Sequence, residues 1–229
     1  MRLSQRLETV ASFVTGSRVA DIGTDHGYIP IELVRRGKVD SAIAMDMRTG
    51  PLERADQHIL EAGLEDQIQT RLSDGVSQLH PGEADSVVIA GMGGELILHI
   101  LEEGHSLWED VAQWVLSPQS EIEKVRTYLT EHGFLIEREA MLCEDGKYYT
   151  VLSVIRGFME PLNQIEARYG RYLIQEKNPV LCEFFQKEAI QISNILHRIY
   201  EEGTQTSTDR REKLEEELKQ IKEAQHAMR

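Results

Sequence analysis

Short apolar segments alternate with amphipathic ones along residues 1–157, and this alternation constrains the fold more than any other feature of the sequence. The apolar segments have the length of strands, and the segments between them repeat their apolar residues at helical spacing. The expected strands cover residues 18–22, 41–45, 68–72, 86–90, 114–116, 134–142 and 148–155. The expected helices cover residues 3–14, 29–36, 51–62, 95–103 and 121–131. Strands that alternate with helices predict a parallel, doubly wound α/β sheet.

Two turn signatures refine this pattern. Pro51 is expected at the first position of its helix, and Gly63 follows the last residue, which is typical of helix ends. The last two strands are joined by Glu144-Asp-Gly-Lys147, and an Asp-Gly pair between strands predicts a tight β-hairpin. This hairpin is expected to add one antiparallel strand at the edge of the sheet.

Residues 158–229 contain no strand pattern. Their apolar residues recur at steps of three and four, the spacing of amphipathic helices. Asn178-Pro179 interrupts the first series, and a polar loop is expected over 203–209. The stripe residues are Leu162, Ile165, Tyr169 and Tyr172, then Phe185, Ala189, Ile192, Leu196 and Ile199, then Leu214, Leu218, Ile221, Gln225 and Met228. The stripes predict an antiparallel helical hairpin, and helices that pack on the sheet domain are the alternative.

Composition excludes several classes of protein. No apolar run approaches the roughly 18–20 residues that a membrane span needs, and the charged N-terminal segment is unlike a secretory signal. The cysteines, Cys143 and Cys182, lie far apart in no metal-binding spacing, which argues against a disulfide scaffold and a zinc site. We therefore expect a cytoplasmic protein without a metal ion.

The net charge of −14 argues at first against nucleic acid as a partner. The charge is unevenly distributed, however. Residues 1–157 hold 14 Lys and Arg against 26 Asp and Glu, a balance of −12, whereas residues 158–229 hold 11 against 13, a balance of −2. A polyanion would therefore meet local basic patches or the nearly neutral C-terminal region.

The loop after the first expected strand carries the most specific chemistry. It reads Asp21-Ile-Gly-Thr-Asp-His-Gly-Tyr28, and glycines between a strand and a helix let a ligand approach the backbone and the free amides of the helix. A dinucleotide loop reads Gly-x-Gly-x-x-Gly, but here Asp21 and Asp25 would repel a pyrophosphate. S-adenosylmethionine carries a sulfonium and an ammonium group, so it fits this loop better than NAD. A capping turn without a ligand is the alternative.

Carboxylates also end the next two strands. Asp46 follows Asp21 by 25 residues, and a carboxylate at that place in such folds accepts the ribose hydroxyls of a nucleoside. Asp74-Gly75 ends the third strand, where the amino group of adenine would lie. Turn formation is the alternative role of both aspartates. Open α/β sheets bind ligands at this edge.

The fourth and fifth strands end in turns that leave an acceptor side open. Residues 89–94, Ile-Ala-Gly-Met-Gly-Gly, supply glycines and a methionine but no catalytic side chain. Ser117-Pro-Gln119 is expected to line an acceptor pocket, and a merely polar strand end is the alternative.

Together these motifs resemble class I S-adenosylmethionine-dependent methyltransferases and, more narrowly, the bacterial tRNA (adenine-22-N-1)-methyltransferase family TrmK. The resemblance rests on the loop over 21–28, the Gly-Met-Gly-Gly turn, Ser-Pro-Gln and the C-terminal helices, and it covers essentially the whole chain. It implies a Rossmann-like seven-stranded sheet with a coiled-coil extension. The implied domains are an S-adenosylmethionine-binding methyltransferase domain over 1–157 and a helical antiparallel coiled coil over 158–229.

The resemblance also implies roles for single residues. Those around the methionine part of the cofactor would be Asp21, Gly23, Asp25 and His26. Those at its ribose, adenine and methyl group would be Asp46, Met47, Asp74, Gly75, Gly91, Met92 and Gly93. The Asp/Asn-Pro-Pro-aromatic motif of many amine methyltransferases is missing after the fourth strand, which leaves the group that orients the acceptor unidentified.

The implied reaction is methylation of N-1 of adenine 22 in tRNA. That nitrogen has a lone pair of its own, so no strong base is needed, but the base must be unpaired. Asp25 is the first candidate to stabilise the cationic product or to take a proton from the exocyclic amine. His26 and Tyr28 are candidates on the acceptor side, and a hydrogen-bonded loop histidine is the alternative for His26.

Basic residues at the rim are the candidates for RNA contact. In the first domain they are Arg35, Arg36, Lys38, Arg48 and Arg54. In the tail they are Arg168, Arg171, Lys177, Arg198, Arg210, Arg211, Lys213, Lys219 and Lys222, where interleaved glutamates make salt-bridged helix faces the alternative. A monomer is expected. A methyltransferase of small molecules or proteins and a non-catalytic cofactor-binding assembly protein remain alternative functions.

Overall fold

The computed structural model describes residues 3–202 and 208–228. Contacts along the chain divide it into two compact units, Met1–Pro161 and Leu162–Arg229. A polar loop is expected over 203–209, and residues 203–207 of it lie outside the described residues. Thr208 begins a helix, so the loop ends earlier than expected.

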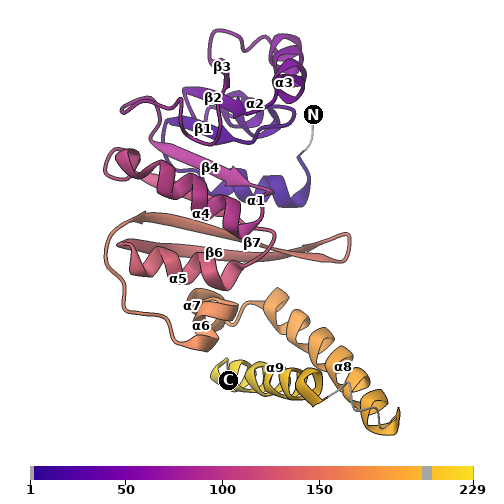
Figure 1. Ribbon diagram of the computed structural model, residues 1–229. Helices are drawn as coiled ribbons and strands as arrows, with labels where there is room; N and C mark the ends of the chain where they lie inside the picture. Colours follow the sequence, from indigo (N-terminus) through magenta and orange to yellow (C-terminus); the bar gives the residue numbers. More distant parts are fainter. Residues whose placement is uncertain (1–2, 203–207, 229) are drawn as a thin grey trace. The chain divides into compact units, whose positions relative to one another are not determined.

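The first unit is built on one seven-stranded sheet with the order β3-β2-β1-β4-β5-β7-β6 (Figure 1). The strands are β1 (Arg18–Ile22), β2 (Ser41–Asp46), β3 (Ile68–Leu72), β4 (Ser86–Ala90), β5 (Gln113–Ser117), β6 (Phe134–Glu144) and β7 (Lys147–Arg156). The five strands from β3 to β5 are parallel to their neighbours, whereas β7 runs antiparallel to both β5 and β6. The predicted Rossmann-like α/β fold is therefore confirmed.

The antiparallel strand is not at the edge, and this corrects the expectation for the terminal hairpin. β7 pairs with β5 through Trp114↔Val154 and lies inside the sheet, and β6 forms the edge. Residues 150–154 of β7 are buried, whereas the middle of β6 exposes Glu137 and Arg138. Charged residues on an outer strand discourage pairing with other chains, so the more apolar strand lies inside. The two-residue turn has φ of 51° at Asp145 and 76° at Gly146, as a type I′ hairpin requires.

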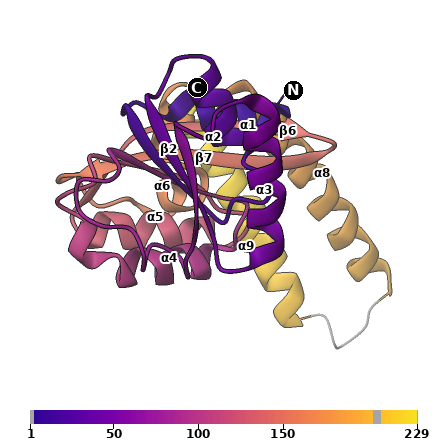
Figure 2. The ribbon, with the colours of Figure 1, turned by 90° about the horizontal axis from the view of Figure 1, so that it is seen from above.

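Helices cover both faces of the sheet (Figure 2). On one face lie α1 (Gln5–Phe13), α2 (Tyr28–Arg35) and α3 (Thr49–Ala62), and on the other lie α4 (Gly94–Glu103) and α5 (Ile122–Glu131), with a single 3-10 turn, η1, at His105–Leu107. α3 begins two residues before Pro51, so the expected start at the proline was wrong. Glu121 does not belong to α5 but caps it in the left-handed region, with φ 48°.

A buried ion pair joins α5 to the sheet. Arg126 Nε donates to Glu139 Oε1 at 2.7 Å, and the two side chains are 2% and 1% exposed. The apolar core of this unit includes Trp114, Leu129 and Phe134, which are fully buried. The edge strand β6 is thereby fixed to the helix layer as well as to β7.

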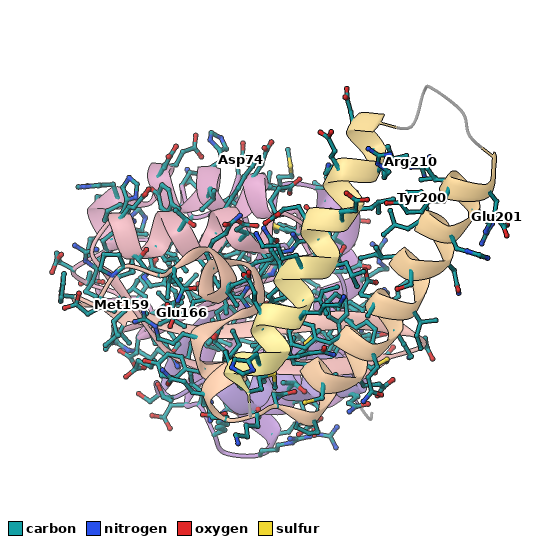
Figure 3. The ribbon with its side chains drawn as sticks, turned by 90° about the horizontal axis from the view of Figure 1, so that it is seen from below. Asp74, Met159, Glu166, Tyr200, Glu201 and Arg210 are labelled. Carbon is teal, nitrogen blue, oxygen red and sulfur yellow. The ribbon has the colours of Figure 1, made fainter. Side chains whose placement is uncertain are left out.

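The second unit consists of α6 (Gln164–Tyr169), α7 (Arg171–Gln175), α8 (Pro179–Glu202) and α9 (Thr208–Ala227). The continuous helix expected over 162–172 is interrupted at Gly170, whose φ of 94° no helix accommodates. α8 and α9 pack against each other, and their buried positions include Phe185, Ile192 and Ile221. Figure 3 shows Tyr200 of α8 reaching toward α9, where its hydroxyl donates to Glu215.

Across residues 3–202 and 208–228, none of the helices combines the length and the apolar character that crossing a bilayer would require.

Candidate functional site

Two adjoining cavities open at the carboxyl ends of β1, β2 and β4. The β2-side cavity has a volume of about 270 Å³ and is lined by Ile22, Gly23, Asp46, Met47, Arg48, Ser73, Asp74, Gly75, Ala90, Gly91, Met92, Leu96 and Ile100. The α1-side cavity has a volume of about 330 Å³ and is lined by Arg6, Leu7, Asp21, Gly23, Thr24, Asp25, His26, Tyr28, Ile29, Ala90, Gly91 and Gln119. The two share Gly23, Ala90 and Gly91, so they form one elongated site. This is the edge at which doubly wound sheets bind ligands.

The loop between β1 and α2 separates the two cavities. The amides of Gly23 and Thr24 both donate to the carbonyl of Met45, at 2.7 and 2.9 Å, which ties the loop to the end of β2. Gly23 has φ 75°, and a Cβ on it would lie 2.1 Å from Met92 Cε. The left-handed backbone favours glycine here, and the flexible end of the Met92 side chain lies directly over it.

Asp21 is a buried carboxylate in the α1-side cavity, with only 6% of the residue exposed. Burial raises its pKa to about 6, because a low-dielectric surrounding disfavours the charged form. Among the described residues no cation forms a salt bridge with it. Such a group favours a ligand that brings a positive charge.

Asp46 lies in the β2-side cavity and is 7% exposed. Its Oδ1 accepts the backbone amide of Arg48 at 2.8 Å and lies 3.5 Å from Arg48 Nε. These contacts orient the carboxylate at the end of β2. No hydrogen bond of the described residues is assigned to Oδ2, which leaves this oxygen available to hydroxyl donors.

The outer part of the β2-side cavity combines apolar and polar surface. Met47 is 63% exposed beside it, an unusual position for a large apolar side chain and one suited to an aromatic base. Asp74 lines the same cavity and is exposed, and Gly75, with φ 50°, lies against Ile100. The buried Ser73 hydroxyl donates to the carbonyl of Gly75 at 2.9 Å and holds this turn in place.

Asp25 differs from Asp21 in its surroundings. Its carboxylate forms an ion pair with Arg54 on α3 and lies 3.4 Å from His26 Nε2, and the side chain is 61% exposed. The hydrogen bond from Arg54 holds the pKa of this carboxyl below its usual range. Asp25 is therefore a lasting anion at the mouth of the α1-side cavity and a poor acceptor of protons.

Three rings cluster beside this anion. His26 and Tyr28 stack at 4.9 Å with 11° between their planes, and His58 of α3 lies 5.4 and 5.3 Å from them. His58 Nδ1 is 3.0 Å from the carbonyl oxygen of His26. His26 Nδ1 is buried, and no hydrogen-bond partner for it is found among the described residues, so a donor or acceptor on a ligand would satisfy it.

Two of the residues expected at the methyl group and the acceptor pocket lie outside both cavities. Gly93 lines neither cavity, and a Cβ there would lie 3.1 Å from Ser120 Oγ. Ser117 is 1% exposed, and its hydroxyl donates to the carbonyl of Thr150 at 3.0 Å, so it does not line the acceptor pocket as expected. Gly91, Met92 and Gln119 do line the cavities.

The basic group after α2 lies away from both cavities, and this corrects its placement at the rim. Arg35 and Arg36 are at the end of α2 remote from the loop, and Arg36 forms ion pairs with Glu8 and Glu32. Lys38 Nζ donates to the carbonyls of Ala11 and Ser12 at 2.7 and 2.9 Å, which caps α1. Arg36 and Lys38 therefore hold α1 against α2, whereas Arg35 lies 3.8 Å from Glu32 within α2.

Several lining residues have no signal in the sequence. Arg6 comes from α1, outside every motif, and Leu96 and Ile100 come from α4. His58 reaches the ring cluster from the middle of α3. Each was brought to the site by packing between elements that are distant in the chain. Within the part of the chain that the structure describes, no group of His, Cys, Asp and Glu side chains is arranged to hold a metal ion.

Comparison with known proteins gives consistent matches. The family model for tRNA (adenine(22)-N(1))-methyltransferase, TrmK, matches residues 19–223. The tRNA (adenine(22)-N(1))-methyltransferase of Bacillus subtilis is 32% identical over 97% of each chain.

Two solved structures extend this similarity to the fold. Mycoplasma capricolum TrmK in complex with S-adenosylhomocysteine matches with a TM-score of 0.87 and 27% identity over the full length of both chains. Streptococcus pneumoniae Sp1610 in complex with S-adenosyl-L-methionine matches with a TM-score of 0.86 and 36% identity, over 97% of this chain and 99% of the other.

Proposed function

This chain belongs to the tRNA (adenine(22)-N(1))-methyltransferase family TrmK, and we propose that it methylates N-1 of adenine 22 in tRNA from S-adenosylmethionine held across its two cavities. The observation that carries this proposal is the junction of the cavities over Gly23 and Gly91, with a buried carboxylate on either side. One carboxylate suits a ribose and the other suits a cationic group.

The residues present fit the cofactor. Asp46, with Oδ2 available, would accept the ribose hydroxyls, and Met47, Asp74 and Gly75 would enclose the adenine. Asp21 would accept the ammonium group of the methionine part. When bound, the cofactor supplies a methyl group on a sulfonium, which is activated toward a nucleophile that attacks in line. Gly91 would keep the backbone close to that group, since it carries no Cβ that would fill the space, and the flexible end of Met92, which lies over Gly23, would have to move aside.

The chain's contribution to the reaction is mainly positioning and charge. The lone pair of adenine N-1 attacks without prior loss of a proton, and the product ring is cationic. Asp25 would stabilise this charge as an anion, and its lowered pKa favours that role over proton transfer. Tyr28 and His26 would orient the unpaired base by stacking and hydrogen bonding.

We assign RNA contact to the second unit. Among its described residues, no ion pair is found for Arg198, Arg210, Lys213 and Lys222, whereas Arg168, Arg171, Arg211 and Lys219 each lie beside a glutamate. Unpaired cations are the ones that can neutralise phosphates. The methyltransferase domain over 1–157 would thus bind the cofactor, and the coiled-coil domain over 158–229 would bind the RNA.

Labelled S-adenosylmethionine and two tRNA transcripts test the proposal. The transcripts are identical except for adenine or guanine at position 22. We expect about one methyl group per adenine-22 transcript, recovered as 1-methyladenosine, and none in the guanine-22 transcript. Label at another nucleotide, or transfer only to a protein or a small molecule, would contradict the proposed substrate.

The cofactor assignment has its own test. Asp46→Ala removes two charge-assisted hydrogen bonds, each worth roughly 1.5–3 kcal/mol, so calorimetry should show at least about tenfold weaker binding of S-adenosylhomocysteine. Unchanged affinity in a folded variant would remove Asp46 from the site. The cytoplasmic location, expected from the cysteine usage, and the monomeric state remain predictions.

A further inference from the structure

His58 is a half-buried residue of α3 to which the reaction proposed above gives no task. Its ring reaches the loop between β1 and α2, where Nδ1 lies 3.0 Å from the carbonyl oxygen of His26. Since a carbonyl oxygen can only accept a hydrogen bond, the proton must be on His58 Nδ1. This bond joins α3 directly to the backbone between the proposed anion, Asp25, and the proposed acceptor-side residue Tyr28.

Two further contacts hold α3 against the same loop. Arg54 forms the ion pair with Asp25, and it precedes His58 by one helical turn. Residues four apart share one face of a helix, so both side chains contact the loop from the same face of α3. Between them, Ala55 packs on the loop itself, because a Cβ on Gly27 would lie 3.3 Å from Ala55 Cβ.

The hydrogen bond fixes the loop more closely than the ring contacts do. The His58 ring lies 5.4 Å from that of His26 and 5.3 Å from that of Tyr28, with 28° and 26° between the planes. Stacked rings tolerate a range of offsets, whereas a hydrogen bond has a preferred direction. The bond from His58 holds the peptide group that lies in the chain between His26 and Tyr28, so the orientation of both acceptor-side rings depends on it.

We propose that His58 is a positioning residue for methyl transfer. Its Nδ1–H holds the carbonyl of His26, so that His26 and Tyr28 present the unpaired adenine to the cofactor in one orientation. His58 lines neither cavity, and it therefore acts through the loop and not on the substrate. The inference rests on the function proposed above and adds a residue of α3 to it.

Three replacements of His58 separate the hydrogen bond from the ring. His58→Asn keeps an N–H donor next to Cγ but no ring, His58→Phe keeps a ring without a donor, and His58→Ala keeps neither. We measure single-turnover methyl transfer to the adenine-22 transcript at saturating S-adenosylmethionine and tRNA. The rate should fall about tenfold or more in the Phe and Ala variants and stay within about threefold of the wild type in the Asn variant. The affinity for S-adenosylhomocysteine should change less than about twofold in all three.

The control and a second readout come from the same helix. Gln57→Ala is the matched control, because Gln57 is exposed and its amide donates to Glu61 at 2.9 Å, away from the loop; its rate should equal that of the wild type. Nitrogen-15 spectra of the wild-type His58 ring give a readout that needs neither activity nor a variant. In the neutral ring, the proton should be on Nδ1 and not on Nε2.

Four results would overturn the inference. A normal rate in His58→Phe with a slow His58→Asn would assign the effect to the ring. Equal slowing by all three replacements would contradict a role of the hydrogen bond, and so would normal rates in all three. A neutral ring with its proton on Nε2 would exclude the bond itself. The proposed function fails separately: if the wild type transfers no methyl group to the adenine-22 transcript, that function is wrong and this inference falls with it.

Discussion

Asp21 near the end of β1 and Asp25 in the following loop lie four residues apart, and their surroundings shift their pKa values in opposite directions. Burial raises the pKa of Asp21 to about 6, whereas the hydrogen bond from Arg54 lowers that of Asp25. Environments that separate two carboxyl groups in this way commonly assign them different tasks. Asp21 is suited to receive a cation from the ligand, and Asp25 is suited to remain charged throughout the reaction.

Cofactor affinity should therefore depend on pH through Asp21. An ammonium group binds the ionised carboxylate, so the affinity for S-adenosylhomocysteine should fall up to about tenfold for each pH unit below about 6 and level off above it. Calorimetry from about pH 5 to 8 measures this dependence. Asp21→Asn should bind weakly and lose this component of the pH dependence; the same slope in the variant would mean that another group is responsible.

The burial of Asp21 should also lower the free energy of unfolding of the protein when no cofactor is bound. The folded-state pKa of Asp21 is raised, so the unfolded chain ionises first as pH rises from about 4 to 6, and stability falls across that window. A shift from 3.8 to about 6 corresponds to roughly 3 kcal/mol above pH 6. Asp21→Asn should accordingly be more stable than the wild type in urea at about pH 7 and equally stable near pH 4. A variant that is less stable at both pH values would contradict this account.

Asp25→Asn should slow methyl transfer more than it weakens cofactor binding. It removes the anion that we propose stabilises the developing positive charge, and we expect a single-turnover rate lower by about tenfold or more, with a cooperative melt retained. Asp40→Asn, at the far end of the sheet before β2, is the control. If Asp25→Asn loses affinity for S-adenosylhomocysteine but transfers at the normal rate when saturated, Asp25 is a binding residue only.

At the scale of elements, one buried ion pair joins α5 to β6. Arg126 and Glu139 are almost completely buried and lie 2.7 Å apart, and neither lines the β2-side or the α1-side cavity. Removal of one partner leaves the other charge in the core, which is costlier than removal of the pair. Their role is therefore structural and separate from catalysis.

Glu139→Ala should destabilise the protein by about 3–5 kcal/mol because the buried Arg126 guanidinium loses its ion pair with Glu139. The double variant Arg126→Met/Glu139→Leu should recover much of this stability, since apolar side chains of similar size fill the same space. Urea unfolding measures both. Cofactor affinity of the folded variants should not change, and a large decrease would show that α5 and β6 affect the cavities.

At the scale of the whole molecule, the two units carry different charges and different chemistry. Every residue that lines the two cavities belongs to the unit Met1–Pro161, whereas Leu162–Arg229 holds the tail cations for which no ion pair is found among the described residues. A negatively charged enzyme can bind a polyanion if the contact is local. The salt dependence of the tRNA affinity then reports how many phosphates the protein neutralises.

The triple variant Arg210→Gln/Lys213→Gln/Lys222→Gln should weaken tRNA binding and lower the salt slope by roughly one for each phosphate that the variant no longer neutralises. Filter binding between low and physiological salt measures this, and S-adenosylhomocysteine affinity should not change. Lys187→Gln is the control, because Lys187 lies 2.8 Å from Glu183.

A chain that ends at Pro161, shown folded by circular dichroism, should keep cofactor binding and lose most tRNA methylation; efficient methylation by it would contradict an RNA role for the tail.

Local patterns in the sequence were enough to predict the fold class, the strands and most of the residues at the cavities. Alternating apolar periods located β1 to β5 within a residue or two, because the spacing of side chains follows directly from backbone geometry. The acidic glycine loop and Asp46 end adjacent parallel strands, so their meeting at one edge follows from the fold class. The turn at Asp145 and Gly146 was predictable for the same local reason.

Packing between distant segments settled the rest, and no local pattern carries that information. It placed β7 inside the sheet, since its buried face suits a central strand better than that of β6, and it brought Arg6 and His58 to the site from helices without a motif. Packing also brought Arg36 to Glu8, Lys38 to the end of α1 and Ser117 to the carbonyl of Thr150. The residues next to them in the sequence do not predict these contacts. Which residues can form each element was set by the order of the amino acids alone, because that choice rests on local geometry. Which side chains remain free to bind a ligand was set only in the folded chain, because that depends on every neighbour in space.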